Sequence, residues 1–374
     1  MRRILVGIIA IIAAVISAKA NDGVFYASGN TLIPLQETRI SLRKELLKFY
    51  VVDHGYARVD VDFEFFNPAG DKTLTVGFVT PPAEGDVSDE ESNHPFITEF
   101  TVNVNGTDVP FKVKKLSQTS FKLGTAAVTG SDFVYFFPVK FKRGLNKIRH
   151  TYRFRGGASV ELQRDFDYQI TTGKRWANRR IDDFELQLHL DNGIFTVIDS
   201  FQKTRASAKW EIVGDGVFGA KRQWFDPKAP RVRMVHLNNG YLRFKAKNFS
   251  PDNDLFFAEY NWPAGWLGAW CGAGKKCDGP DQLERAARFF NLAPWYEPSD
   301  EDFSELTAND IRIVRNYFYA VRGLPFRDPD LRRFYAQFFW YKPIEGLSPA
   351  DVKLTESEEK FLKKLAAFEA KGKS

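Results

Sequence analysis

The chain has 374 residues, with 53 Lys and Arg against 47 Asp and Glu, and 35 of its residues are phenylalanine. A composition that is 44% hydrophobic and 15% aromatic excludes an intrinsically disordered chain and can fill more than one core. The formal charge of +6 is small and scattered, which argues against a nucleic-acid-binding face.

The first 20 residues have the features of a signal peptide. Arg2-Arg3 is a basic start, residues 4–16 are uncharged and mostly aliphatic, and Ala18-Lys19-Ala20 is a small-x-small cleavage site. The apolar run is too short to span a bilayer comfortably. Three basic residues lie in this segment, so the mature chain would carry +3 instead of +6. We expect a periplasmic or extracellular protein with no integral membrane segment after cleavage.

Residues 21–260 are predicted to form an antiparallel, sandwich-like β region. Apolar and charged residues alternate over residues 57–65, 147–155 and 184–191, which is typical of strands with one buried face. Asn105-Gly106 is a strong signal for a two-residue hairpin. The region is either continuous or divided into two subdomains near residues 156–180.

Two groups of acids in this region are candidates for catalytic carboxylates. Asp165 and Asp167 would share one face of a strand, whereas the consecutive acids Asp182-Asp183 would point in opposite directions. A cross-strand ion pair of Asp165 and Asp167 with Arg153 and Arg155 is the simpler interpretation. The alternative is a hydrolase that acts on envelope polymers with carboxylates of the β region.

Residues 261–302 are predicted to be a connector with a short helix that begins at Pro280. Three tryptophans, Trp262, Trp266 and Trp270, recur at four-residue steps, and they either pack a seam or stack on sugar rings. The two cysteines, Cys271 and Cys277, are expected to form a disulfide in an oxidising compartment. A metal site is the rival interpretation, but the five histidines lie far away in the sequence.

Catalytic and cofactor motifs are missing from the sequence. It contains neither a Gly-x-Ser-x-Gly elbow nor a His-Glu-x-x-His motif, and Gly274-Lys275 fails the phosphate-loop pattern. The acidic segment 84–94 lacks the residue order of a calcium loop. We therefore expect no cofactor and no metal, and a non-catalytic role is favoured over an enzyme.

The C-terminal end is predicted to be helical. Thr307 with Asp310, and Thr355 with Glu358, have the spacing of capping boxes. Gly323 is placed to end the helix that starts after Thr307. Asp328-Pro329 is then an N-cap followed by proline at the first helical position.

This end of the chain resembles the YARHG domain, a small extracellular module of bacteria. The resemblance covers residues 303–370 and depends on Arg315-Asn316, Tyr319-Ala-Val-Arg-Gly323, Phe326, Leu331 and Trp340-Tyr-Lys-Pro343. Val321 and Arg322 stand where the family motif has Arg-His. The resemblance implies an exported protein, and the activity of such modules is unassigned.

Four residues of the motif are candidate ligand contacts: Tyr319, Arg322, Trp340 and Tyr341. Their aromatic side chains either form the core of a helical unit, which is the usual role of aromatics at helical spacing, or they line a surface groove for a polar ligand.

The first half also resembles secreted bacterial domains of unknown function. The matching segments are Asn21-Asp22, Ile40-Ser-Leu-Arg-Lys-Glu-Leu46, Phe65-Phe-Asn67, Phe78-Val-Thr-Pro-Pro82, Trp176-Ala-Asn and Ile181-Asp-Asp-Phe184. We expect an exported envelope protein that binds or scaffolds, with cell-wall glycan, peptidoglycan or another envelope protein as the candidate partner.

Overall fold

The computed structural model describes residues 33–34, 39–52, 55–80, 97–119, 133–157, 162–203, 208–223, 230–260, 271, 280–290 and 298–371. The predicted signal peptide, the acidic segment 84–94, the three connector tryptophans and Cys277 lie outside these residues. The expected disulfide therefore stays a prediction, and Cys271 itself is buried at 4% exposure.

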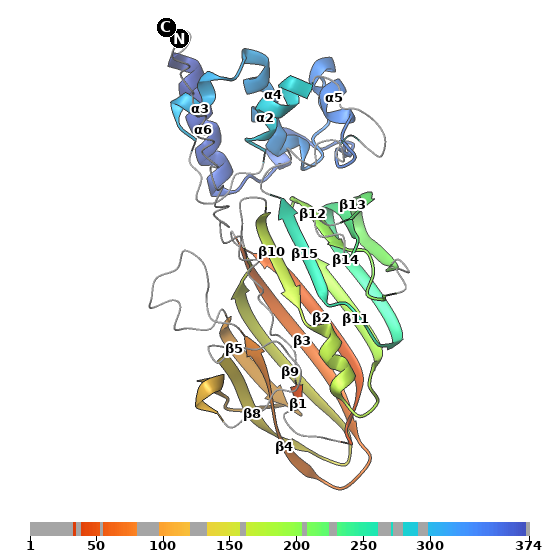
Figure 1. The fold of residues 1–374 in the computed structure, drawn as a ribbon. Helices are drawn as coiled ribbons and strands as arrows, with labels where there is room; N and C mark the ends of the chain where they lie inside the picture. Colours follow the sequence, from red (N-terminus) through yellow and green to blue (C-terminus); the bar gives the residue numbers. More distant parts are fainter. Residues whose placement is uncertain are drawn as a thin grey trace, which may run out of the picture.

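Two β-sheets form the body of the protein (Figure 1). The larger has 11 strands among the described residues, in the order β10-β15-β12-β14-β11-β2-β3-β9-β5-β6, with β13 paired to β14. Its strands are β2 (Ser41–Val52), β3 (Tyr56–Asn67), β5 (Ile97–Val104), β6 (Thr107–Asp108), β9 (Gly144–Arg155), β10 (Leu162–Tyr168), β11 (Ile181–His189), β12 (Ile194–Ile198), β13 (Trp210–Arg222), β14 (Val232–Phe249) and β15 (Leu255–Tyr260).

The smaller sheet covers part of one face of the larger sheet. It contains β1 (Ile33–Pro34), β4 (Lys72–Thr80), β8 (Phe133–Phe141) and β7 (Lys112–Lys115), in the order β1-β4-β8-β7. Aromatic rings join the two layers: Phe65 of β3 meets Phe141 of β8 at 5.7 Å between ring centroids, and Phe78 of β4 meets Phe100 of β5 at 5.2 Å. Many of the phenylalanines in the sequence are used to fill this core.

The predicted alternation and hairpin are confirmed. In β3, the inward residues Ala57, Val59, Val61, Phe63 and Phe65 are each at most 1% exposed. Asn105 and Gly106 have φ values of 53° and 89°, the left-handed conformation of a two-residue hairpin turn. Val104 of β5 is accordingly paired with Thr107 of β6.

One strand pair departs from the predicted antiparallel pattern. β11 lies parallel to β2, with Asp183 opposite Lys44 and His189 opposite Tyr50. The two strands lie far apart in the sequence, so no hairpin signal could show this contact. The large sheet therefore runs through both sides of the alternative division near 156–180, while the domain boundaries stay predictions.

A helical unit follows the sheets, as predicted for the C-terminal end. It contains α2 (Pro280–Ala287), α3 (Asp300–Ser304), α4 (Ala308–Ala320), α5 (Pro329–Ala336), the 3-10 turn η4 (Pro349–Asp351) and α6 (Glu356–Lys371). Two further 3-10 turns, η2 (Leu116–Gln118) and η3 (Ile170–Arg175), lie in the β region. The three predicted caps are present: Thr307 with Asp310, Asp328 at the start of α5, and Thr355 with Glu358. Gly323 has a φ of +80°, as its position after α4 requires.

The helical unit packs on one end of the large sheet (Figure 1). Ile194, Val232, Met234 and Ala258 of the sheet belong to the same buried cluster as the helices. Polar contacts cross this seam too, because Nε2 of His236 in β14 lies 2.8 Å from the carbonyl oxygen of Val321. Within the described part of the chain, no helix is long and apolar enough to cross a membrane.

Candidate functional site

Three of the four residues predicted as ligand contacts are aromatic, and two of these lie in the core of the helical unit. Trp340 is fully buried and stacks on Phe338 at 5.1 Å between ring centroids. Tyr341 is 8% exposed, and its hydroxyl donates to the carbonyl oxygen of Leu324 at 3.0 Å. Tyr319 is half-buried on α4. This placement corresponds to the core interpretation, while the ligand role stays a prediction.

The fourth residue, Arg322, joins the end of α4 to the start of α6. One terminal nitrogen donates to the carbonyl oxygen of Phe318 at 2.8 Å, and the other lies 2.7 Å from Oε2 of Glu358. The same carboxylate oxygen accepts the backbone N–H of Thr355 at 2.7 Å. The two terminal nitrogens of the guanidinium are thus occupied in a partly buried contact between helices.

Replacing Tyr341 by phenylalanine should lower the free energy of unfolding by about 1 kcal/mol, because a buried carbonyl loses its donor. Tyr319→Phe is the matched control, since its hydroxyl makes no hydrogen bond to the described residues; its cost should stay below about 0.5 kcal/mol. Urea unfolding measures both values. Equal costs for the two variants would contradict the core role of the Tyr341 hydroxyl.

The candidate catalytic acids do not form an accessible pair. Burial raises the pKa of Asp165 to about 7, and burial followed by the charge of Asp165 raises that of Asp167 well above its usual value. Asp165 is 4% exposed, so a polymer could not reach it. Within the described ranges, no group of three or more His, Cys, Asp or Glu side chains could hold a metal ion.

The predicted ion pairs of these acids with Arg153 and Arg155 are wrong. The strand β10 pairs with β15, which places Asp165 opposite Ala258. Arg153 instead lies over the ring of Tyr56 at 4.3 Å on β3. The consecutive acids Asp182 and Asp183 have separate partners, Arg43 at 2.6 Å and Lys247 at 2.8 Å.

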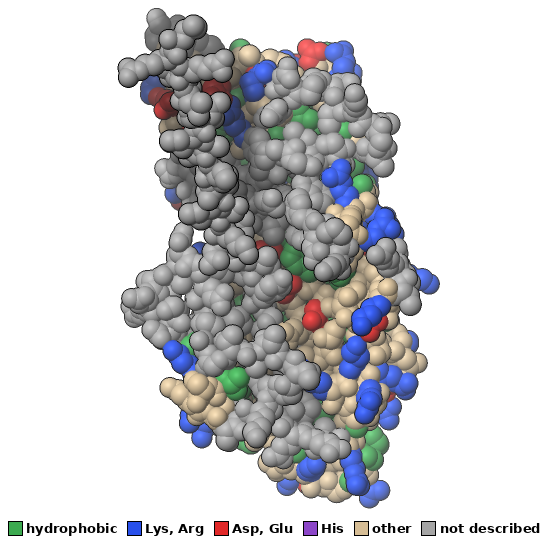
Figure 2. All heavy atoms as spheres, in the orientation of Figure 1, with side chains coloured by type: hydrophobic (Ala, Val, Ile, Leu, Met, Phe, Trp, Pro, Cys, Tyr) green, Lys and Arg blue, Asp and Glu red, His purple; other side chains and the backbone are tan. Residues whose placement is uncertain are grey.

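The face of the large sheet opposite the core carries stripes of alternating charge, called the striped face below. Each stripe is one strand: the register places basic β14, acidic β11, basic β2, acidic β3 and basic β9 side by side. The stripes consist of Lys247, Lys245 and Arg243; Asp183 and Glu185; Lys44 and Lys48; Glu64, Asp62 and Asp60; and Lys147 and Arg149. Figure 2 shows the molecule from the opposite side, on which β1 and β4 lie in front of the large sheet, so the striped face is hidden in that view.

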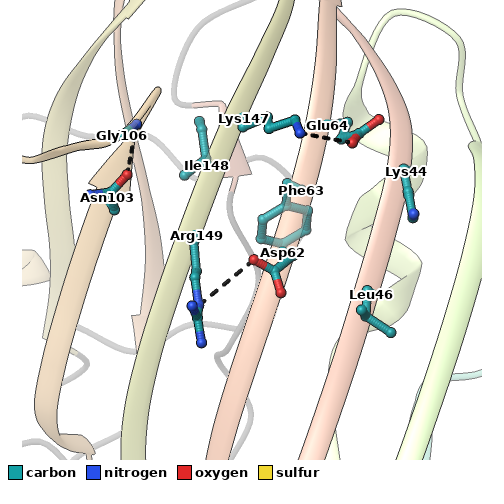
Figure 3. Close-up of a pocket in the computed structure, with 10 residues that line it drawn as sticks. All are labelled: Lys44, Leu46, Asp62, Phe63, Glu64, Asn103, Gly106, Lys147, Ile148 and Arg149. Carbon is teal, nitrogen blue, oxygen red and sulfur yellow. Dashed lines mark hydrogen bonds and ion pairs between the residues drawn. The ribbon is translucent and has the colours of Figure 1, made fainter.

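A groove of about 380 Å³ lies on the striped face, where β2, β3 and β9 meet the β5–β6 hairpin (Figure 3). Its wall at the hairpin is made by Asn103 and Gly106. Its other lining residues are Lys44, Leu46, Asp62, Phe63, Glu64, Lys147, Ile148 and Arg149. The groove therefore presents cations, carboxylates and one apolar side chain, Leu46, toward solvent.

The ion pairs of the groove are loose. Nζ of Lys147 is 3.9 Å from Glu64, and Nε of Arg149 is 3.7 Å from Asp62. Both separations exceed hydrogen-bond distance, so these groups keep donors and acceptors for a ligand. Surface pairs elsewhere range from closed, as for Arg243 with Glu211 at 2.8 Å, to equally loose, as for Arg153 with Glu99 at 3.9 Å.

A row of planar groups lies elsewhere on the striped face and does not line the groove. The ring of Tyr50 stacks on His189 at 4.4 Å between centroids, and the guanidinium of Arg58 lies 4.4 Å over the same tyrosine. Tyr241 continues the row at 4.8 Å from His189. Because the faces of these groups pack against one another, the groups stiffen the sheet, and mainly their ring edges remain for a ligand.

A second, smaller hollow of about 240 Å³ lies on the helical unit between α2, α4 and α5. Its floor is apolar, and its rim carries carboxamides, one acid, Asp330, and one cation, Arg333. It does not contain any of the four residues predicted as ligand contacts.

Sequence reasoning missed the groove because its residues come from four separate strands. The alternation of each strand was visible, but the charges on outward positions looked like solvated strand faces. The parallel contact of β11 with β2 and the strand order create the stripes. The signal that could have predicted the stripes is that the outward charges of each strand have mostly one sign.

Comparison with protein families identifies the helical unit. Residues 294–370 match the model of the YARHG domain, so the predicted resemblance is confirmed, and the match begins before the predicted boundary at 303. No curated protein matches the chain.

Three solved structures illustrate how distant the structural matches are. A Legionella pneumophila protein, provisionally described as nutrient binding, is 17% identical, has a TM-score of 0.48, and the match covers 91% of this chain and 98% of that one. An M1 zinc metallopeptidase of Deinococcus radiodurans is 11% identical with a TM-score of 0.26, covering 69% of this chain and 53% of that one. A Parabacteroides distasonis protein, provisionally described as a protease, is 9% identical with a TM-score of 0.26, and the match covers 80% of this chain and 54% of that one. The chain thus spans about half the length of the last two chains, and scores this low assign neither activity nor substrate.

Proposed function

We propose that the protein is exported to the cell envelope and binds an envelope polymer, with peptidoglycan as the candidate, without catalysing a reaction. The export part is supported by the predicted signal peptide and by the YARHG domain, a module typical of exported proteins. The striped face of the large sheet, centred on the groove, is the proposed binding surface.

The observation that carries this proposal is the set of loose ion pairs in the groove. Exposed ion pairs contribute only about 0–1 kcal/mol to stability, so a ligand can replace them at little cost. A carboxylate of the ligand can then bind Lys147 or Arg149, while Asp62 and Glu64 accept hydrogen bonds from its N–H groups. The packed core on the other side keeps the backbone of the sheet rigid.

Retention on purified peptidoglycan sacculi tests the proposal. We expect the mature chain to sediment with sacculi, and the double variant Lys147→Glu/Arg149→Glu to bind at least about tenfold more weakly, because two favourable charges become repulsive. The control Lys353→Glu/Lys363→Glu makes the same change in net charge at exposed positions of the helical end, and it should bind like the unmodified protein.

Two results would contradict the proposal. The first is no sedimentation of the unmodified chain. The second is an equal loss in both double variants, which would show that net charge and not the groove causes retention.

The alternative function is a hydrolase, and one observation favours it. Asp165 and Asp167 share a face of β10 and both have raised pKa values, as carboxyl acids in catalysis often do. Their burial argues against access of a polymer. Release of soluble fragments from labelled sacculi, abolished by Asp165→Asn, would establish the hydrolase and displace the binding role.

A further inference from the structure

We infer that the groove recognises the peptide part of the envelope polymer, and specifically a diamino acid residue with a free ammonium group close to a carboxylate. This inference rests on the proposed function and names its ligand. It is carried by the charge order of the striped face and by the interruption of one stripe at Leu46.

The order of the stripes selects for a ligand with both charges. Neighbouring strands lie about 4.8 Å apart, so basic stripes alternate with acidic stripes at that spacing. A uniformly anionic chain would have to lie across the carboxylates of β3, and an uncharged glycan would leave the charged groups unused. A short peptide that carries carboxylates and an ammonium group can match neighbouring stripes at once.

Leu46 creates a specific slot within this pattern. It takes a position in the basic stripe of β2, opposite Asp62 of β3 on one side and Glu185 of β11 on the other. Figure 3 shows Leu46 beside Asp62, with Arg149 on the far side of that acid. An apolar side chain here provides a surface for methylene groups.

The two acids beside Leu46 are not equivalent. Glu185 is engaged by Lys245 at 3.1 Å and by the amide of Gln187 at 2.7 Å. Asp62 has the loose contact with Arg149 at 3.7 Å, and its side chain is 48% exposed. When the alkyl chain of the ligand packs against Leu46, the ammonium group at its end would therefore bind Asp62.

The partners of the anionic part of the ligand lie in the next row of the same face, two residues along each strand. Lys44 and Lys147 flank Glu64 on either side, and the second of these pairs is open at 3.9 Å. Side chains on the same face of a strand repeat at about 6.6–6.8 Å. A carboxylate at that distance from the ammonium group fits Lys147 or Lys44, which is the arrangement within a peptide that contains a diamino acid.

Competition with a soluble peptide tests the inference. The probe is L-alanyl-γ-D-glutamyl-L-lysine, and its matched control is the same tripeptide acetylated on the lysine side chain. We expect the free tripeptide to release the full mature chain from sacculi, and the acetylated form to need about tenfold more for the same effect, as for one lost charge-assisted hydrogen bond. In the Asp62→Asn variant, the difference in potency between the free and the acetylated tripeptide should fall to about twofold. In the Asp183→Asn variant, on another stripe, it should stay at about tenfold.

The outcomes separate the two proposals. If sacculi stripped of peptides by an amidase retain the protein as well as intact sacculi do, and neither tripeptide competes, the inference is wrong and the binding role stands. Equal potency of the two tripeptides would also overturn the inference. If intact sacculi do not retain the unmodified chain, the binding role itself fails.

Discussion

Glu45→Gln should make the protein more stable at pH 8, by on the order of 3 kcal/mol, and should flatten the dependence of stability on pH. Glu45 is fully buried in the core between the sheets, and its Oε2 has no hydrogen-bond partner among the described residues. Burial raises its pKa from 4.5 to about 8, against the lowering effect of the Tyr168 hydroxyl, which donates to Oε1 at 3.3 Å.

The direction of the effect follows from this raised pKa. The unfolded chain releases the proton above pH 4.5, whereas the folded chain keeps it until about pH 8. The stabilising contribution of the protonated Glu45 is therefore complete below pH 4.5 and is lost as the pH rises to 8. Glutamine is neutral throughout, so the difference between the two proteins should be small at pH 4.5 and largest at pH 8.

Urea unfolding at pH 4.5, 6 and 8 measures this difference. The comparison of two proteins is needed because buried His150, with its pKa lowered to about 3 by burial, contributes in the opposite direction in both. Glu64→Gln, on the striped face of the same sheet, is the matched control and should not show the gain. A Glu45→Gln protein that is less stable at pH 8 would contradict a protonated Glu45.

The second large effect is expected at Arg164, where the end of the sheet meets the helical unit. Its guanidinium lies 2.7 Å from Glu259 and 2.5 Å from Asp191, and its side chain is 8% exposed. Arg164→Met should cost about 3–5 kcal/mol, because it leaves the buried Glu259 without its cation. Glu259→Met in the same protein removes that uncompensated charge and should restore most of the loss.

Urea unfolding at pH 7 of the two single variants and the double variant tests this coupling. Arg43→Met is the matched control, since it breaks the largely exposed pair with Asp182 and should cost no more than about 1 kcal/mol. Additive losses at Arg164 and Glu259 would show that the two side chains are not energetically coupled.

The local features of the fold could be predicted from the sequence. The alternation in β3, the turn at Asn105-Gly106 and the cap at Thr307 depend on neighbouring residues, and each is present in the structure. The parallel contact of β11 with β2 could not be predicted, because it depends on how distant strands assemble. The burial of Glu45 was hidden too, since a register shift between Leu42 and Lys44 turns this residue toward the core.

The candidate site shows the same limit. The motif residues of the helical end were recognisable, but two of the aromatic ones, Trp340 and Tyr341, pack in the core. The groove is formed by outward residues of separate strands, and their juxtaposition requires the register of β2, β3 and β9. A single sequence shows such residues only as the polar halves of alternating strands.

Carbodiimide labelling of carboxylates, with and without solubilised peptidoglycan fragments, tests most directly whether the striped face binds the ligand. Fragments should protect Asp62 and Glu64 from labelling, while Glu211 on β13 and Asp330 at the smaller hollow keep their reactivity. Unchanged labelling of Asp62 and Glu64, or protection confined to Asp330, would contradict it.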